Sequence, residues 1–230
     1  MAGLEETEIR EQLSDLFEVL TEPQQTRLLE CMTYRHYRKD ELIYHEGETP
    51  RQLFCLLSGK VKIYKDGIGR SQIVRVISPG EYFGYRAAIA HEAFITEASA
   101  FEHSFIVKFP LALIWEYMQE NAHLGCFFVQ KLAMALGKSD ERLVSLTQKH
   151  VRARLADSLL YLKEFYGLED DGQTLAAHLS RYDLANLSNM TTNNAIRTLR
   201  GFVAEGIIDA RRRDLRIINE QELRHISAIG

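Results

Sequence analysis

The fold of this chain is decided by residues 180–199, which read SRYDLANLSNMTTNNAIRTL. The stretch predicts two short helices joined by a tight turn, the arrangement that places a helix in the major groove of DNA. Leu184 and Leu187 form the inner face of the first helix, and the small Ala185 lets the second helix cross closely. Asn189 falls where the chain must reverse, and asparagine tolerates the left-handed backbone conformation. An ordinary helical hairpin inside a core is the alternative.

The second helix of the pair has one apolar and one polar side. Thr191 can cap its start through the hydroxyl group, and we expect Ala195, Ile196, Leu199 and Phe202 to be buried. Short or forked hydrogen-bonding side chains remain on the other side, suited to base edges and phosphates. From both helices, the residues predicted to contact DNA are Ser180, Arg181, Thr191, Thr192, Asn193, Asn194 and Arg197.

A β-hairpin is predicted directly after this helix. Gly206 is suited to a left-handed helix cap, and residues 207–210 and 215–218 are two short β-prone runs. Arg211, Arg212 and Arg213 lie at the tip between them. A run of arginines is often only a solvated turn. Placed after a recognition-type helix, this tip is predicted to reach DNA phosphates as a wing.

Composition and charge agree with a two-domain globular protein. The chain has 230 residues, 46% hydrophobic and 26% charged, enough for two cores. Its net charge of −4 divides unevenly. Residues 177–216 hold seven Lys/Arg against four Asp/Glu, a net of +3, whereas residues 1–147 hold sixteen against twenty-one, a net of −5. DNA affinity depends on charge at the contact face, so the basic surface is predicted to be local.

Cysteine usage and the chain start suggest a compartment. Cys31, Cys55 and Cys126 are odd in number and widely spaced, without metal-binding spacing, which predicts buried thiols and a reducing cytoplasm. The acidic start lacks a secretory pattern, and no apolar run approaches membrane-spanning length. We therefore expect a cytoplasmic protein without a membrane partner.

The first half of the chain combines two helices with short strands. Residues 4–20 have mostly helical apolar spacing, and Pro23 starts a second short helix. Between Tyr34 and Phe109, β-prone runs alternate with Gly and Pro turns, which is typical of an antiparallel jelly-roll barrel. The predicted strands are residues 41–44, 53–57, 60–64, 72–77, 93–98 and 104–109.

Three helices follow the predicted barrel, at residues 110–121, about 122–147 and about 150–166. The middle one carries apolar residues at alternating steps of three and four, a heptad seam interrupted by Ser139. This pattern favours a parallel two-stranded coiled coil between subunits, and packing against the chain's own barrel is the alternative. The predicted dimer residues are Val129, Leu132, Leu136, Ser139, Leu143 and Leu146. We place the domain boundary after residue 147, with a sensor and dimer helix in 1–147 and a DNA-binding domain in 148–230.

Taken together, these features resemble the CRP/FNR family of bacterial transcription regulators over nearly the whole chain. In the sensor half the resemblance lies in residues 46–48, 56–64 and 78–84, and in the second half it lies in residues 184–199 and the wing. It implies an α+β fold with an N-terminal cyclic-nucleotide-binding-like jelly-roll barrel, a long dimerisation helix and a C-terminal winged helix-turn-helix. It also implies a homodimer on a palindromic operator in double-stranded DNA. Of the three base- or phosphate-reading positions in the family, only Arg197 keeps the residue usual in cyclic-AMP-binding members, so a different operator sequence is expected.

The same resemblance argues against cyclic AMP as the effector. Members that bind it use a glutamate and an arginine after the Phe-Gly pair, whereas this chain has Tyr85 at the first position and Ile95, followed by Thr96, at the second. A buried phosphate without its guanidinium partner would be poorly compensated, and Arg86 lies elsewhere in the loop. The effector stays unidentified, and the candidate pocket residues are Gly84, Tyr85, Arg86, Ile95, Thr96, Ser139 and Asp140.

The residues present bear on two cofactors that related proteins use. No cysteine precedes Cys31, so an iron–sulfur cluster is not expected. A haem is kept as an alternative because five histidines lie in or near the sensor half, although a lone histidine is more often structural. His91, in the effector loop, is the first candidate ligand among His36, His45, His91, His103 and His123.

Two other functions fit the residues of this chain less well. A jelly-roll metalloenzyme needs a His-x-His pair with a nearby Glu, and the sequence contains no such pair, so we predict no enzyme and no metal site. A cyclic-nucleotide-regulated module of a kinase would not carry the predicted wing. The acidic loop at 169–171 is a candidate contact for RNA polymerase by position only, with a solvated charge run as the alternative.

Overall fold

The computed structural model describes residues 6–68 and 70–229, as two compact units. The first unit comprises Met1–Lys65 and Arg75–Gly137, and the second comprises Asp66–Val74 and Lys138–Gly230. The domain boundary predicted after residue 147 stays a prediction.

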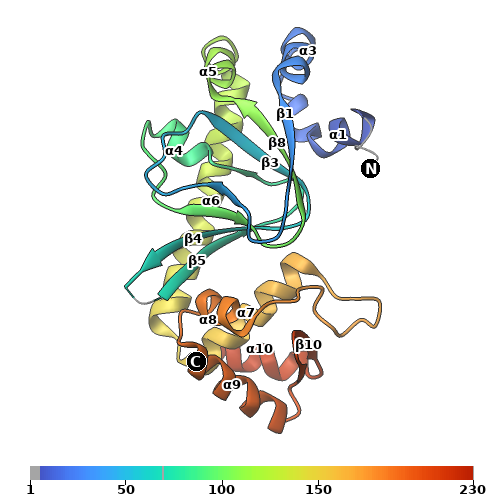
Figure 1. The fold of residues 1–230 in the computed structure, drawn as a ribbon, viewed down its shortest axis with the longest axis vertical. Helices are drawn as coiled ribbons and strands as arrows, with labels where there is room; N and C mark the ends of the chain where they lie inside the picture. The colour runs from blue at the N-terminus through green and yellow to red at the C-terminus, as the bar shows by residue number, and fades with distance from the viewer. Residues whose placement is uncertain (1–5, 69, 230) are drawn as a thin grey trace. The chain divides into compact units, whose positions relative to one another are not determined.

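Two four-stranded sheets form the barrel of the first unit (Figure 1), with strand orders β1-β8-β3-β6 and β2-β7-β4-β5. The pairs with a defined register are antiparallel. The strands are β1 (Thr33–Tyr37), β2 (Leu42–Tyr44), β3 (Gln52–Ser58), β4 (Val61–Gly67), β5 (Arg70–Ile77), β6 (Tyr82–Phe83), β7 (Glu97–Ala100) and β8 (Ser104–Pro110).

Strand β3 is buried on both faces because it separates two apolar cores. Phe54 and Leu56 point into a core inside the barrel, whereas Leu53, Cys55 and Leu57 point into a core shared with helices. Successive side chains of a strand alternate between faces, so an uninterrupted apolar run is what a doubly covered strand requires. The helices of the second core are α1 (Glu6–Gln12), α2 (Ser14–Phe17), α3 (Glu22–Cys31), α4 (Tyr85–Ile89), α5 (Leu111–Glu120) and the first half of α6 (Ala122–Gln148).

Gly59, between β3 and β4, lies where no other residue fits. Its φ is +86°, and a Cβ atom there would lie 2.2 Å from the carbonyl oxygen of His103. Ser104 Oγ lies in the same corner and donates to the carbonyl of Lys60 at 2.9 Å. The Ser58-Gly59 turn predicted from sequence therefore requires glycine at position 59, because the backbone of His103 leaves no room for a side chain.

Several expectations for the first half were wrong in detail. The helix predicted over 4–20 ends at Gln12 and restarts at Ser14, and its residues 4 and 5 lie outside the described range. The strand predicted at 93–98 begins only at Glu97, because Phe94 pairs with a loop instead, through bonds to the backbone of Gly47 and Glu48. Strands β1 and β6 and the short helix α4 (Tyr85–Ile89) were not expected. The prediction of buried thiols holds for Cys55 but is wrong for Cys31 and Cys126, which are exposed.

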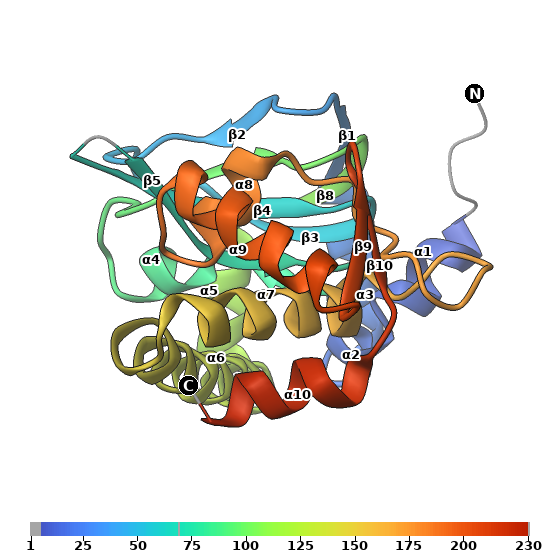
Figure 2. The same ribbon diagram turned by 90° about the horizontal axis from the view of Figure 1, so that it is seen from below.

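The second unit contains α7 (Val151–Tyr166), α8 (Arg181–Leu187), α9 (Thr192–Ala204), the β9–β10 hairpin (Ile208–Arg211 and Asp214–Ile217) and α10 (Glu220–Ile229), all visible in Figure 2. Helix α10 was not predicted. The segment at residues 173–175, before α8, pairs with strand β10 of the hairpin. Leu175 N donates to Leu215 O at 2.8 Å, and Ile217 N donates to Gln173 O at 2.9 Å.

Candidate nucleic-acid interface

Side-chain caps fix the starts of both helices in the predicted helix-turn-helix. Ser180 Oγ accepts from the backbone N–H of Asp183 at 3.0 Å, and Thr191 Oγ1 accepts from Asn194 N at 3.2 Å. Each cap satisfies one of the N–H groups that a helix start leaves without a partner. Asn189 has a φ of +50° in the turn, as its sequence position predicted. The turn is thus built by residues that favour it locally.

Helix α9 packs through its apolar face as expected, with one correction. Ala195, Leu199 and Phe202 are buried, whereas Ile196 is only half-buried, and Thr198 is buried in addition. Residues 195, 199 and 202 lie on one face of the helix because they are three or four positions apart. Ile196 lies at the edge of that face. Leu184, Ala185 and Leu187 of α8 are buried too, which allows the close crossing.

Helix α7 fixes the far end of α9. Arg152 forms an ion pair with Glu205 at 2.6 Å, and its guanidinium lies 4.9 Å from the centre of the Phe202 ring. The hydrogen bond from Arg152 lowers the pKa of the Glu205 carboxyl. Gly206 then ends the segment with a φ of +71°, the left-handed conformation predicted for it.

The opposite face of α9 presents polar and basic side chains. Asn193 and Arg197 are exposed, Thr192 and Asn194 are half-buried, and Arg197 Nη2 donates to Asn194 Oδ1 at 3.2 Å. Arg200 is also exposed, and at seven residues from Asn193 it lies on the same face. Sequence reasoning missed Arg200, although its helical spacing was a usable signal.

The wing tip is a two-residue turn made of arginines. Arg211 pairs with Asp214 in the hairpin register, leaving Arg212 and Arg213 in the turn. All three arginines are exposed, and Arg211 Nε lies 3.0 Å from the carboxylate of Asp209. Arg212 has a φ of +52°, which is uncommon for a residue with a side chain. The tip projects cationic groups that can meet phosphate.

Ser180 and Arg181 differ from the other predicted DNA contacts. The Ser180 hydroxyl is occupied by Asp183, to which it also donates at 2.6 Å. Arg181 is half-buried, and desolvation lowers the pKa of its guanidinium. Within the described residues, its Nη1 atom is buried without a hydrogen-bond partner. The structure therefore gives Ser180 a capping role, and the DNA contact of both residues stays a prediction.

The predicted dimer seam lies along α6 and is largely uncovered within the subunit. Val129, Leu136 and Leu143 expose 66%, 64% and 61% of their surfaces. Ser139 is exposed, and Leu132 and Leu146 are half-buried. Phe127 and Phe128 are buried against the barrel. One side of the first half of α6 thus packs on the barrel while the seam positions stay accessible.

The candidate effector residues lie in different environments. Tyr85 is 4% exposed and its hydroxyl donates to the carbonyl of Lys131 in α6 at 3.4 Å. Arg86 is exposed and pairs with Glu92 at 3.0 Å, and Ile95 is 53% exposed. Gly84 has a φ of +82° and lies against the Phe54 ring.

Thr96 is half-buried and hydrogen-bonds Tyr44, whose pKa is raised to about 12 by burial. The Tyr44 ring stacks on Phe94 at 3.8 Å, so the barrel interior near this loop is aromatic. The other two candidates, Ser139 and Asp140, are exposed and belong to the second unit. Their role in an effector pocket stays a prediction.

His91, the candidate haem ligand, has a φ of +55° and stacks on Trp115 with ring centres 4.8 Å apart. Haem binding stays a prediction. Among the described residues, no group of three or more His, Cys, Asp and Glu side chains is placed to hold a metal ion. Among the helices of residues 6–68 and 70–229, none is long and apolar enough to cross a membrane.

Two family models match the chain, one in each half. Residues 34–121 match the cyclic nucleotide-binding domain, and residues 153–226 match the Crp-like helix-turn-helix domain. The second match contains α8, α9 and the wing. Both parts of the expected architecture are therefore confirmed.

Known proteins with similar sequences fall into two groups. Human cGMP-dependent protein kinase 2 is 33% identical over 79 residues, which is 34% of this chain and only 10% of the kinase. The CRP-like cAMP-activated global transcriptional regulator of Mycobacterium tuberculosis is 21% identical over 189 residues, 81% of this chain and 84% of the regulator. The chain thus spans most of the length of the regulator but a small part of the kinase.

Solved structures show the same fold. FixK2 from Bradyrhizobium japonicum superimposes with a TM-score of 0.76 at 23% identity, over 86% of this chain and 98% of that one. Barrel, long helix and C-terminal helix-turn-helix thus occur together in one solved protein fold, as they do here. With both domain models matched in this order, the chain belongs to the CRP/FNR family of DNA-binding transcription regulators.

Proposed function

We propose that this protein acts as a homodimer that binds a palindromic operator in double-stranded DNA. The observation that carries the proposal is the pairing of two surfaces: the polar, basic face of α9 and the uncovered apolar seam of α6. A seam shared by two subunits generates a twofold axis. Two recognition helices related by that axis match half-sites about 34 Å apart, one turn of DNA.

Each part of the reader has a distinct proposed role. Arg197, with Asn193 and Thr192, reads base edges in the major groove, because forked and short polar side chains suit the donor and acceptor pattern there. Arg212 and Arg213 contact phosphates, which fixes register without reading sequence. The function is therefore regulatory and not catalytic. RNA polymerase is a candidate partner through the loop at 169–171.

The proposed sensor does not take cyclic AMP in the usual way. Neither Ile95 nor Thr96 can supply a guanidinium to a cyclic phosphate, and Tyr85 is buried and bonded to α6. Calorimetry with cyclic AMP and cyclic GMP tests this, and micromolar binding would contradict it. The identity of the signal is left open.

Selection of bound duplexes from a random DNA library tests the DNA-binding proposal directly. The expected outcome is an enriched inverted repeat, bound by two subunits as measured by light scattering of the complex. Enrichment of a single asymmetric site bound by one subunit would refute the dimeric mode. Absence of any enriched sequence would refute sequence-specific binding.

A further inference from the structure

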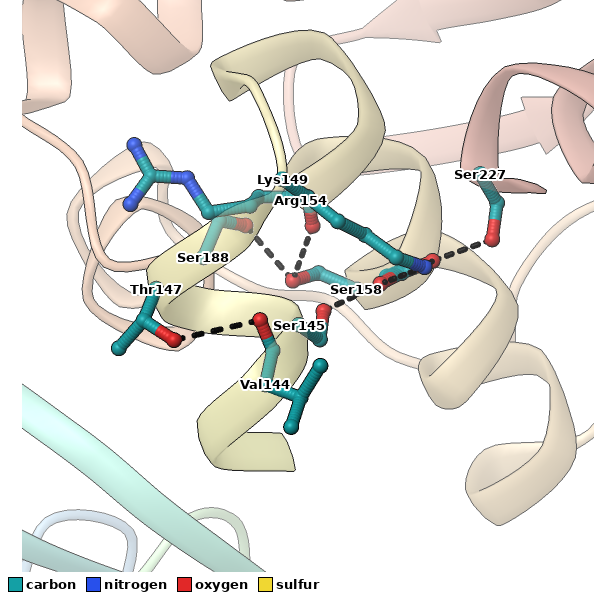
Figure 3. Close-up of polar contacts among 9 residues, drawn as sticks. Val144, Ser145, Thr147, Lys149, Arg154, Ser158, Ser188 and Ser227 are labelled. Atoms are coloured by element: carbon teal, nitrogen blue, oxygen red, sulfur yellow. Dashed lines mark hydrogen bonds and ion pairs between the residues drawn. The ribbon is translucent and has the colours of Figure 1, made fainter. Parts of the chain in front are cut away.

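Asp157, in the second turn of α7, collects hydrogen bonds from three parts of the second unit. Its carboxylate accepts from Ser145 Oγ in α6 and from Ser227 Oγ in α10. Lys149, between α6 and α7, donates to both carboxylate oxygens at 3.0 and 2.8 Å. Figure 3 shows Ser145, Lys149 and Ser227 converging from these elements. We call these four residues the Asp157 cluster.

The cluster lies beside the joint between the dimer helix and the reader. Helix α6 ends at Gln148 and α7 begins at Val151, with His150 extended between them at φ −65° and ψ 161°. Among the described residues, no side-chain cap bonds to the start of α7. Arg154 Nη1 donates to the carbonyl of Leu146 at 3.1 Å. Side chains of α7 therefore reach back to α6, where the Arg154 guanidinium satisfies one of the carbonyl groups near the end of that helix.

Helix α7 in turn holds the helix-turn-helix. Ser158, the next residue after Asp157, accepts from the hydroxyl of Ser188 at 2.8 Å and donates to the carbonyl of Arg154 at 2.9 Å. Ser188 is the C-cap of α8 and is fully buried. Arg152 holds the end of α9, as described above. A rotation of α7 against α6 would therefore carry both reader helices with it.

We propose that Asp157 is a positioning residue that fixes the angle between the second half of α6 and the reader. This inference rests on the proposed dimeric function. In a dimer, the α6 seams set the twofold axis, so an angle error at each joint displaces both recognition helices from their half-sites. Asp157 thereby sets the half-site spacing that the dimer accepts, without contacting DNA.

The charge environment makes the isosteric variant Asp157→Asn informative. Asp157 and Lys149 retain 22% and 27% side-chain exposure, and a cavity of about 540 Å³ lined by Asp157, Tyr161 and Ser227 adjoins them. A lysine left without its partner stays hydrated, so the fold should survive. The amide keeps one acceptor oxygen but loses the charge that holds Lys149. Glu164→Gln is the matched control, because Glu164 is exposed on the same helix and lines the same cavity.

The experiment compares operators of different half-site spacing. After the wild-type operator has been selected, Kd is measured by fluorescence anisotropy for that duplex, for versions with one base pair inserted or removed, and for a single half-site. We expect Asp157→Asn to reduce the discrimination between correct and altered spacing by about tenfold, the usual scale of coupling between distant sites. The affinity of Asp157→Asn for the single half-site and the mass of its dimer should match those of the wild type. The control Glu164→Gln should match the wild type in every measurement. Ser227→Ala, which removes one donor to Asp157, should give a smaller loss of discrimination.

Each outcome decides between the proposals. A general loss of stability would weaken binding to all duplexes in proportion and leave the spacing ratio unchanged, which would overturn the positioning role. An unchanged ratio in a stable Asp157→Asn dimer would overturn it as well. If the wild type itself shows no spacing preference, the dimeric operator mode fails first, and the inference about Asp157 fails with it.

Discussion

Truncation of Leu136 at the α6 seam should weaken the dimer and leave the subunit folded. Leu136 exposes 64% of its surface in the subunit. Full burial of a leucine side chain is worth about 1.5–3 kcal/mol, so covering this fraction contributes about 1–2 kcal/mol per subunit and about 2–4 kcal/mol per dimer. Since 1.4 kcal/mol is tenfold in an equilibrium constant, Leu136→Ala should raise the dimer Kd on the order of 100-fold.

The assay is sedimentation equilibrium over a dilution series, with circular dichroism to follow helix content. Met134→Ala is the matched control, because Met134 is 57% exposed on the same helix but lies at the outer heptad position relative to the seam. It should leave the dimer Kd unchanged. The reasoning is refuted if Leu136→Ala dimerises like the wild type, or if Met134→Ala weakens the dimer equally.

Four further predictions concern single side chains of the second unit. Arg197→Ala should abolish discrimination between operator and random DNA in a gel-shift assay while the dimer persists, because Arg197 is exposed; unchanged operator affinity would contradict this. Asn189→Ala should lower the free energy of unfolding by about 1–2 kcal/mol, because alanine tolerates a φ of +50° poorly. Asn189→Gly should not lower it, and thermal melting compares the two variants. Arg212→Ala should reduce the slope of log K against log salt by about 0.9 if one phosphate contact is lost, and an unchanged slope would remove the wing tip from the interface. Bonds from the Thr174 side chain and from backbone N–H groups lower the pKa of Asp171 to about 2. Since this folded-state pKa lies below the unfolded value, the stabilisation is present above the unfolded pKa and is lost as pH falls towards 2; a carboxyl NMR titration midpoint near 4 would contradict it.

Helices α8 and α9 and the hairpin could be predicted from sequence because their local signals agree with their tertiary packing. Thr191 is a favourable cap, Asn189 tolerates the left-handed turn, and the apolar spacing of α9 matches the face it buries. Each of these preferences acts over a few residues and needs no knowledge of the rest of the chain. The half-burial of Ile196 was not predictable in the same way, because it depends on how far neighbouring elements reach around the helix.

Strands whose stability comes from distant partners were harder to predict. Strand β1 shows no alternation, since Thr33 to His36 are all exposed, and it is held by pairing with β8. In β7 the small residues Ala98, Ser99 and Ala100 have little strand preference, yet pairing with β2 and β4 buries them. The more strand-like Phe94 and Ile95 lie in a loop. Strand preference reflects fit to a packed surface, so the sequence favoured the wrong segment.

The same difference between local signals and contacts with distant segments applies to the site residues. The exposed face of α9 follows from helical periodicity alone, so Arg197 and its neighbours could be assigned before the structure was known. The Asp157 cluster could not, because Ser145, Lys149 and Ser227 approach one carboxylate from separate elements and carry no motif. A serine and a lysine near a helix end usually indicate only a solvated surface.

Helix α6 contributes residues to both compact units. Its first half packs on the barrel, its second half reaches the Asp157 cluster, and the two compact units divide after Gly137. A Cβ at Gly137 would have nothing within 4 Å, so no steric contact requires glycine there. Glycine costs about 1 kcal/mol relative to alanine inside a helix, and Ser139 places a polar group in the seam just beyond it. Gly137 therefore lowers the helix propensity of α6 next to the point where the chain passes from the first unit to the second.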